Sequence, residues 1–555
     1  MTFKKNVLPR AHVTPPPKKY EPDEKECPKC GMPLRVKKTQ KRRLVTPTQD
    51  VKVVEVIKRC NCSNETFVSK KLRKLTPPKS PYSFDLLAQI GRLRFEEHRQ
   101  VSDIRRHFSK SGISIPDTTA QRLCKRFLKY FTAVHLECPP QIKEKMEQNG
   151  GYVLQIDGTQ NHGRGTIMLL KDSLSGIRLY SARVESEKAD YIEPILKDIR
   201  DLYGPPLAVI RDMGKGIAKA VDNVFEGAVV IICHFHFLRA LGNRLFKYYH
   251  DKFRKNVDKT GVKGKLKELR RNAKTRLKTV RDPFAVDVLN ELVGVLNDVL
   301  TSSGEGLGYP FDLSKLRFYE RCLKAEKRVE QLVERCINAW NRVAIAYDVH
   351  GVLKRLHKSN YRLAKYAEIL QEREVWFKKA RQALRWKNGP IPLSTKVRWS
   401  DGELKAARKG IDAFLEEISL NRKEEKVLKG KGSHLLRAFS TIEQMFTENR
   451  ERLLAPNVVV QTPKGKREIK LERTNNGVEQ DFRSTRRHGR RLKGNRDVEE
   501  LIQKEGVGLL LLLNMEIEEY VKMVYSSWDA MGKRFAEVKK ESLAAAEKIL
   551  EGSNR

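Results

Sequence analysis

The feature of this 555-residue chain that most constrains its fold is a change of hydrophobic period near Gly151. Three apolar runs follow one another over residues 152–157, 166–170 and 177–184, with glycines at the turns. A helical pattern then alternates with two further apolar runs, 207–210 and 228–233. Because strands that alternate with helices usually form α/β layers, this order predicts a mixed sheet covered by helices.

The α/β pattern is interrupted by a long segment with the period of helices. Residues 241–455 are highly charged and hold few strand candidates, so they predict an all-α insertion domain. Strand features return after residue 456, and helical patterns follow as far as residue 515. We therefore expect a multidomain α/β plus α protein. Its α/β domain would consist of 150–240 and 456–515, and 516–555 would form a charged helical C-terminal tail.

Three smaller segments precede the α/β domain. Residues 1–24 are rich in proline and lysine and predict a disordered basic tail. Residues 25–75 carry a C-x2-C pair and a C-x-C pair, which favours a zinc ribbon. The second pair has one intervening residue rather than the commoner two, so two surface thiol pairs without metal are the alternative. The predicted ligands of a structural Zn²⁺ are Cys27, Cys30, Cys60 and Cys62.

Residues 82–135 have the pattern of short helices with a turn at Gly112, which fits a helix-turn-helix. The alternative is a generic small helical bundle. In a helix-turn-helix, exposed residues near the start of the second helix contact bases and nearby cations contact phosphates. The predicted DNA-binding residues here are Thr118, Thr119, Gln121, Arg122, Lys125 and Arg126.

The charge of the chain indicates a polyanionic partner. Lys and Arg number 111 against 69 Asp and Glu, a formal charge of +42. The basic, proline-rich first residues do not have the pattern of a secretory signal, and no apolar run approaches the ~20 residues of a membrane span. Nine cysteines in a chain of this size do not indicate a disulfide framework. We expect a cytoplasmic, nucleoid-associated protein that binds double-stranded DNA and no membrane.

Two of the apolar runs lead directly into an acid. The run VLQID ends at Asp157 and LAVIRD ends at Asp212, while far downstream the sequence TNN leads into a helix that carries Glu479. If the two strands pair, these three carboxylates would form a cage for two Mg²⁺ (or Mn²⁺) ions. Such a cage in a cationic chain indicates phosphodiester chemistry on nucleic acid. For either aspartate alone, the alternative is a turn or a helix cap.

Four segments occur in the order LQIDGT, AVIRDMGKGI, CHFHFLRALG and RTNNGVEQDFRSTRRHGRRLKG. In these segments and their order, the chain resembles the DDE transposases of prokaryotic insertion sequences. The resemblance covers about residues 151–515. The resemblance implies a ribonuclease H-like catalytic domain in which Asp157, Asp212 and Glu479 hold the metal ions. It also implies binding of terminal inverted repeats, cleavage of the transposon ends and joining of the 3′ ends to target DNA. Because both ends must be held together, we expect a homodimer or a higher oligomer on DNA.

Further residues surround this predicted site. Cys233 and His236 match a Cys-x-x-His of the related transposases, which with Asn476 would support the active site. A buried cysteine and a hydrogen-bonded core histidine are the alternative for the first two. The helix after Glu479 predicts a phosphate track of Arg483, Arg486, Arg487 and Arg490. Tryptophans within the insertion would either stack on a base or fill the core: Trp340, Trp376, Trp386 and Trp399.

Two other functions remain open from the sequence. A ribonuclease H-like nuclease without strand transfer would use the same carboxylates. A domesticated DNA-binding regulator would need none of them, so the intact acids favour an enzyme.

Overall fold

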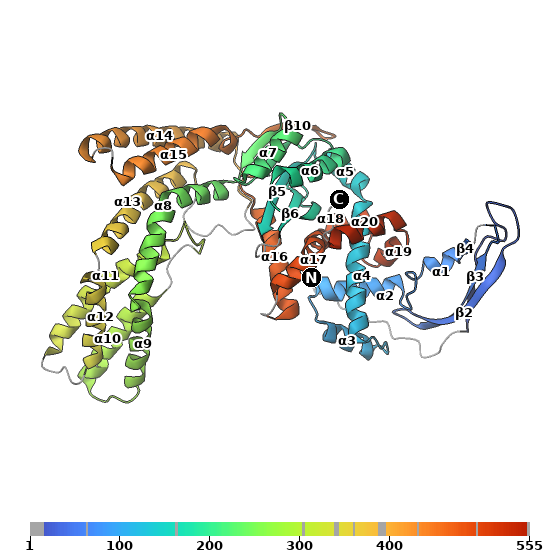
Figure 1. Cartoon of the computed structure of the whole chain (residues 1–555), viewed down its shortest axis with the longest axis horizontal. Coiled ribbons are helices and arrows are strands. Elements are labelled where there is room, and N and C mark those ends of the chain that lie inside the picture. The colour runs from blue at the N-terminus through green and yellow to red at the C-terminus, as the bar shows by residue number, and fades with distance from the viewer. Residues whose placement is uncertain are drawn as a thin grey trace. The chain divides into compact units, whose positions relative to one another are not determined.

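The computed structural model describes residues 16–62, 65–160, 165–301, 306–337, 343–358, 361–386, 396–429, 432–494 and 498–551. The chain forms two compact units, one of Met1–Val230 with Val458–Arg555 and the other of Ile231–Asn457 (Figure 1). Sheets occur in the first unit, and the described part of the second is almost wholly helical. The predicted combination of mixed α/β and all-α parts is therefore confirmed.

The largest sheet has five strands in the order β7-β6-β5-β8-β9. Neighbours β5, β6 and β7 are antiparallel, and β5 and β8 are parallel. All five strands were predicted from the apolar runs, and they span β5 (Val153–Gln160), β6 (Thr166–Asp172), β7 (Arg178–Val184), β8 (Ala208–Arg211) and β9 (Val229–Ile232).

Alternate residues of the central strands point into two different cores. Leu154 and Ile156 of β5 and Met168 of β6 belong to a large core that includes α6 (Ala189–Tyr203) and α7 (Lys215–Val224). Ile167 and Leu169 of β6 pack instead against α16 (Asn476–Lys493) and α17 (Val498–Leu512). Since side chains alternate between the faces of a strand, Gln155 and Asp157 lie on the α16 face.

The residues before α16 form a hairpin of β10 (Val458–Thr462) and β11 (Gly465–Ile469), a separate two-stranded antiparallel sheet. The strand features predicted after residue 456 are thus confirmed. The hairpin lies against the start of the α/β domain, because a Cβ at Gly150 would be 2.6 Å from the side chain of Val460.

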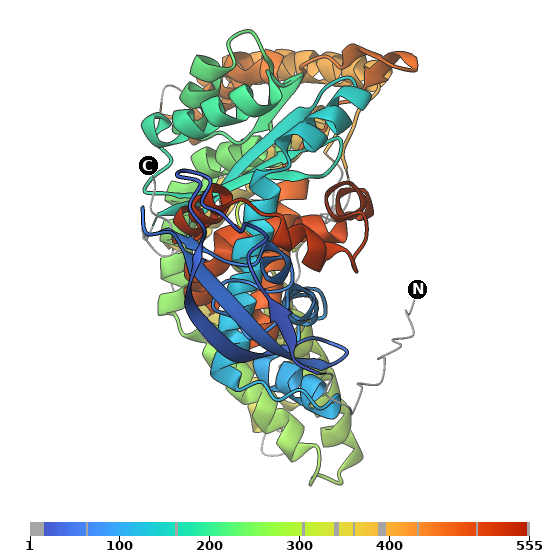
Figure 2. The same cartoon turned by 90° about the vertical axis from the view of Figure 1, so that its right-hand side faces the viewer.

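The N-terminal sheet contains β1 (Lys18–Tyr20), β2 (Arg35–Val45), β3 (Asp50–Arg59) and β4 (Thr66–Phe67), followed by α1 (Lys70–Arg73). Figure 2 shows the long β2–β3 hairpin broadside. The prediction that residues 1–24 are a disordered tail is wrong for 18–20. These residues pair in parallel with 53–55 of β3, and Tyr20 packs on the small core beneath that strand. Residues 1–15 lie outside the described part.

The C-terminal residues are helical, as predicted, but they pack on the helices of residues 82–135. Phe535 lies 5.5 Å from Phe127, ring to ring, and Glu547 forms a 2.7 Å ion pair with Lys129. Burial of Met531, Phe535 and Ala546 explains this packing, since a solvated tail would leave these side chains exposed. The N-terminal set is α2 (Phe84–Gly91), η1 (Arg92–Glu96), α3 (Val101–Lys110), α4 (Asp117–Leu136) and α5 (Pro139–Gln148). The C-terminal set is η3 (Leu513–Glu516), α18 (Glu518–Tyr525), α19 (Met531–Ala536) and α20 (Lys540–Glu551).

The second unit is built from helices around an aromatic core that includes Phe237, Phe246 and Phe377. Its helices are α8 (His234–Lys259), α9 (Val262–Arg276), α10 (Pro283–Leu300), α11 (Ser314–Arg335), α12 (Ala344–Lys358), α13 (Tyr361–Ala383), α14 (Asp401–Lys429) and α15 (His434–Leu453). Among the described residues of the chain, no helix combines the length and the apolar character that a bilayer crossing requires.

Candidate active site and metal centre

Two aspartates lie at matching positions of neighbouring strands in the five-stranded sheet. The parallel pairing of β5 and β8 places Gln155 opposite Ile210. Continued two residues beyond the last recorded pair, the same offset matches Asp157 with Asp212, the residue that directly follows β8 (210 − 155 and 212 − 157 are both 55). Paired residues of parallel strands point to the same face, so both carboxylates lie on the α16 side of the sheet.

Each aspartate also makes a local turn bond. Oδ1 of Asp157 accepts the backbone N–H of Gly158 at 2.9 Å, and Oδ1 of Asp212 accepts that of Gly214 at 2.8 Å. A Cβ at Gly214 would lie 2.9 Å from this Asp212 oxygen, so a larger residue there would displace the Asp212 carboxylate. Each aspartate therefore does bond to a turn, as the alternative interpretation predicts. These bonds use only the Oδ1 atom of each carboxylate.

The start of α16 is tied to β5 next to Asp157. Nδ2 of Asn475 donates to the carbonyl oxygen of Ile156 at 2.9 Å, and Nε2 of Gln155 donates to the carbonyl oxygen of Thr474 at 3.3 Å. Sequence reasoning selected Asn476 as the supporting residue, whereas Asn475 makes this contact and Asn476 is buried at the first position of the helix. The Asn-Asn sequence thus fixes where the helix begins relative to the strand.

The pKa of Asp157 responds to the charges of the other two predicted acids. Its side chain is only 6% exposed, and this burial raises its pKa well above the usual range. The negative charge of Asp212 raises it further, followed by smaller contributions from Glu479 and Glu187. Only the bond from Gly158 acts in the opposite direction. The carboxylates therefore repel one another across a shared space.

Glu187 is a fourth carboxylate that the sequence did not reveal. It lies between β7 and α6, and its Oε1 would be 3.1 Å from a Cβ at Gly158. Burial and the charge of Asp212 raise its pKa. The backbone of Glu187 also requires a glycine at 216, where a Cβ would be 1.7 Å from its carbonyl oxygen. Gly158 and Gly216, which follow the two predicted aspartates, were the available signal for a close neighbour, although they did not identify it.

Within the described residues, Asp157, Asp212 and Glu187 form no ion pair with a lysine, arginine or histidine. Glu479 pairs with Arg483 one helical turn away, at 3.0 Å, with both side chains partly exposed. Carboxylate oxygens are the donors that hard divalent cations prefer. The group therefore consists of oxygen donors whose mutual repulsion no cation of the described residues offsets, apart from Arg483 beside Glu479.

A buried ionic network holds α16 against the sheet on its other side. Asp481 accepts from Lys171 Nζ at 2.9 Å and from Arg178 through two nitrogens, at 3.0 and 2.5 Å. Arg178 also donates to the carbonyl oxygen of Leu513. Sequence reasoning missed this network, in which two cations of neighbouring strands meet one acid of the helix. It fixes the helix two residues after Glu479.

The predicted phosphate track is exposed along α16. Arg483, Arg487 and Arg490 are exposed, and the half-buried Arg486 donates to Oγ1 of Thr159 at 2.7 Å. At 3.6 residues per turn, Arg483, Arg486 and Arg490 lie within about 40° of Glu479 on the helix surface. The cations therefore extend from the carboxylate group along one side of the helix.

The helices predicted for DNA reading are present as α3 and α4, with Gly112 between them in a left-handed conformation (φ +70°). Ile104, Phe108 and Ile113 form their shared core. Every predicted contact residue keeps at least part of its side chain accessible. Thr118, Gln121, Arg122 and Lys125 are exposed, and Thr119 and Arg126 are half-buried.

The four N-terminal cysteines gather into one group. Measured between Sγ atoms, Cys60 lies 3.0 Å from Cys62 and 3.4 Å from Cys30, and Cys27 lies 3.7 Å from Cys62. Thiolates around a tetrahedral Zn²⁺ stand about 3.8 Å apart, given Zn–S bonds of about 2.3 Å. Backbone N–H groups of Lys29 and Cys30 lower the pKa of the Cys27 thiol to about 7. These residues can therefore hold a metal such as zinc.

The two metal-ligand sets differ in spacing. Among the described residues, only the cysteines form a group of three or more ligand atoms that all lie within 4.8 Å of one another. The carboxylates near Asp157 are thus more widely spaced.

Other predicted site residues lie in the second unit. Cys233 is buried directly before α8, and His236 is half-buried in its first turn. The neighbouring His234 is buried and its Nε2 lies 2.9 Å from the carbonyl oxygen of Leu453. Trp376, Trp386 and Trp399 are buried, which favours the core alternative for these tryptophans. Trp340 lies outside the described residues.

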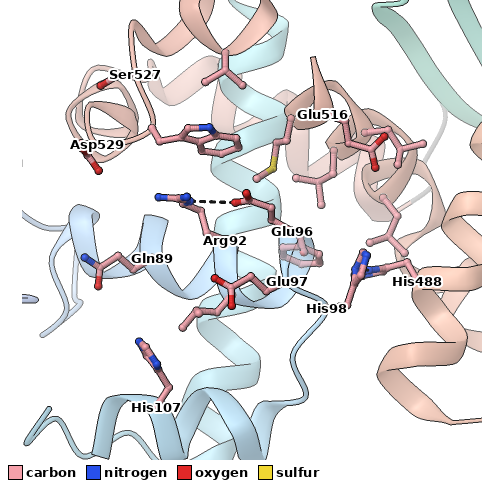
Figure 3. A pocket seen from close by; sticks show the side chains of 18 of the residues that line it. Gln89, Arg92, Glu96, Glu97, His98, His107, His488, Glu516, Ser527 and Asp529 are labelled. Atoms are coloured by element: carbon pink, nitrogen blue, oxygen red, sulfur yellow. Dashed lines mark hydrogen bonds and ion pairs between the residues drawn. The ribbon is translucent and has the colours of Figure 1, made fainter. Parts of the chain in front are cut away.

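A cleft of about 1290 Å³ is lined by residues of η1, α3 and α16, among others (Figure 3). His98 and His488 meet there, with their Nδ1 atoms 2.6 Å apart, and burial lowers the pKa of His488 to about 3. The cleft is lined by four lysines and arginines and five acids: Arg92, Arg487, Arg491 and Lys522 against Glu96, Glu97, Glu516, Glu518 and Asp529. This near balance does not suit a phosphate backbone, and none of the four carboxylates near Asp157 lines the cleft.

The acids and arginines predicted for catalysis thus lie together in the first unit, whereas Cys233 and His236 belong to the second. Comparison with protein families and with curated proteins finds no significant match to this chain.

Proposed function

We propose that this chain is a DDE-type transposase with a ribonuclease H-like catalytic domain. It binds the terminal inverted repeats of a transposon, cleaves the ends and joins the 3′ ends to target DNA. The observation that carries the proposal is the matched register of Asp157 and Asp212 beneath the helix that brings Glu479. The strand order, with three antiparallel strands followed by a parallel one, supports the ribonuclease H-like fold.

Asp157, Asp212 and Glu479, with Glu187 beside them, would hold two divalent cations. When bound, such ions lower the pKa of the attacking water or 3′ hydroxyl and neutralise charge on the phosphate. The donor set fits this role because it consists of carboxylates that repel one another. Asp481, Lys171 and Arg178 keep the helix that carries Glu479 on the sheet.

The arginines of α16 would bind the DNA next to the carboxylates. Guanidinium groups bond phosphate oxygens in a planar, two-point geometry. Arg483, Arg487 and Arg490 are exposed, and Arg483 also pairs with Glu479. The start of α4 would read base edges, while Lys125 and Arg126 would contact phosphates. A zinc-bound N-terminal sheet would stabilise the module next to these helices.

The proposal is tested by incubating the purified chain with the DNA that flanks its coding sequence, Mg²⁺ and a supercoiled plasmid. We expect cuts at defined end sequences and plasmid-joined products. The Asp157→Asn and Glu479→Gln variants should bind the same DNA without cutting it. Cuts without joined products would indicate a nuclease. Binding without any cleavage in Mg²⁺ or Mn²⁺ would leave only a DNA-binding regulator.

A further inference from the structure

The helix α9, in the second unit, has a strong excess of positive charge. Its fifteen residues hold seven lysines and arginines and one acid, Glu268, a net charge of +6 (7 − 1). Its apolar side chains Val262, Leu266, Leu269 and Ala273 are buried, and the helix packs against α10 and α12. The fold therefore leaves the charged side of α9 toward solvent.

Four of these cations form one stripe. Lys263, Lys267, Arg271 and Lys274 are all exposed. At 3.6 residues per turn they lie within about 80° of one another around the helix. With a rise of 1.5 Å per residue, the stripe extends over about 16 Å.

The neighbouring helix α11 shows what a solvated charged helix looks like in the same unit. Three of its four arginines pair with acids: Arg317 with Glu320 at 2.7 Å, Arg328 with Asp298 at 3.2 Å and Arg335 with Asp287 at 3.0 Å. The four stripe cations of α9 have no ion pair with any acid of the described residues. Elsewhere on α9, Lys265 pairs with Glu268 at 3.1 Å, off the stripe. Four like charges on one face are therefore left without compensation.

We infer that the α9 stripe binds the sugar-phosphate backbone of double-stranded DNA. B-form DNA carries one charge per ~1.7 Å, so a stripe of about 16 Å faces some nine phosphate charges. Three of the four cations are lysines, which bind phosphate as point charges and read no base pattern. The contact is therefore independent of sequence. This inference rests on the proposed function and adds a holding surface for flanking or target DNA.

An anionic membrane is a less suitable partner for this stripe. Helices that lie on a bilayer insert apolar side chains beside their cations. The apolar side chains of α9 are instead buried within the unit.

The test measures how salt weakens DNA binding. The full chain carrying Asp157→Asn, without divalent metal, is titrated against a fluorescent duplex of arbitrary sequence between 50 and 200 mM KCl. The comparison is with the same chain carrying K263Q, K267Q, R271Q and K274Q. Each lost phosphate contact reduces the slope of log K against log salt by ~0.9, so four reduce it by up to about 3.6. Between 50 and 200 mM KCl, the DNA affinity of the chain with the unmodified stripe should fall by a factor about 150 times larger than that of the variant.

The matched control removes four exposed lysines from α14: K405Q, K409Q, K423Q and K426Q. The charge change is the same, but Asp412 and Glu416 interrupt that face, so we expect little change in slope. The inference would be overturned by an unchanged slope in the α9 variant or by an equal drop in the control. It would also be overturned if the α9 variant lost binding to anionic vesicles but not to DNA. Circular dichroism and thermal melting confirm that both variants fold. If the unmodified chain binds no duplex even at 50 mM KCl, the proposed function fails with it.

Discussion

The two groups of candidate metal ligands in the first unit are built in opposite ways. The four cysteines come from two turns of one small sheet, within 35 residues, and their sulfur atoms already lie at zinc-site spacing. The carboxylates come from separate strands, a loop and a helix between positions 157 and 479, and they repel one another. Compact thiols suit a metal that holds a fold together, whereas spaced carboxylates leave positions for a substrate.

The largest effect is expected at the cysteines. The Cys60→Ser variant should lose its bound zinc and with it folding free energy on the order of 10 kcal/mol, so that residues 16–75 unfold. Zinc content and hydrogen exchange of this segment measure the outcome. The Asn61→Ser variant, changed between two ligands at an exposed position, should keep its zinc. Equal zinc content in both variants would show that Cys60 is not a zinc ligand, and the contrast between the two ligand groups would then fail.

Asp157→Asn should reduce metal-dependent cleavage to about one thousandth or less, the scale for losing one member of a cooperating set. Metal-free stability should change in the opposite direction. The folded-state pKa of Asp157 is raised, so its favourable contribution is complete below the unfolded pKa and is lost as pH rises through the folded value. Urea denaturation in EDTA at pH 8 should therefore find the Asn variant more stable than the wild type. A less stable variant would mean that Asp157 is a structural cap.

Asp481→Asn tests whether the carboxylates depend on the buried network around α16. Removing one partner of a buried ion pair costs about 3–5 kcal/mol. We expect a loss of that size in urea unfolding, together with slower cleavage. Glu518→Gln breaks the exposed pair with Lys522 and should cost less than about 1 kcal/mol. Similar losses in the two variants would contradict a special role for the network.

Glu187→Gln should have the smallest effect on activity. Residues that support a metal site typically contribute 10- to 100-fold in affinity or rate, so cleavage at low Mg²⁺ should fall by about that much and recover at high Mg²⁺. Glu185→Gln, an exposed change in the same loop, is the control. If both variants require the same Mg²⁺ concentration as the wild type, Glu187 is not part of the site.

The sequence predicted those parts of the site that depend on local pattern. The strands were visible because buried strands read as apolar runs, and both aspartates were visible because each follows such a run. Their matched register was not visible, although it follows once the strands pair. The start of α16 at the Asn-Asn sequence was also predictable, since such residues occur at helix starts.

The remaining parts depend on contacts between distant segments. Glu187 lies in an ordinary charged loop, and only the glycines packed against it suggest its position. Asp481 lies on the same helix as Glu479, but its partners Lys171 and Arg178 lie about 300 residues earlier in the sequence, on two strands. The packing of residues 516–555 was missed because their apolar residues are interspersed with charged ones, and the helices that they cover lie hundreds of residues earlier in the chain.

The contact between α20 and α4 has a consequence for how the protein is made. The last helix ends at Glu551 and covers residues of α4, which ends at Leu136. Ribosomes add about 5–20 residues per second, so these 415 residues (551 − 136) take about 20–80 s to synthesise. During that time the side of α4 that packs against α20 is not yet buried by it. The helices that would read DNA therefore reach their finished state only after residue 551 has been synthesised.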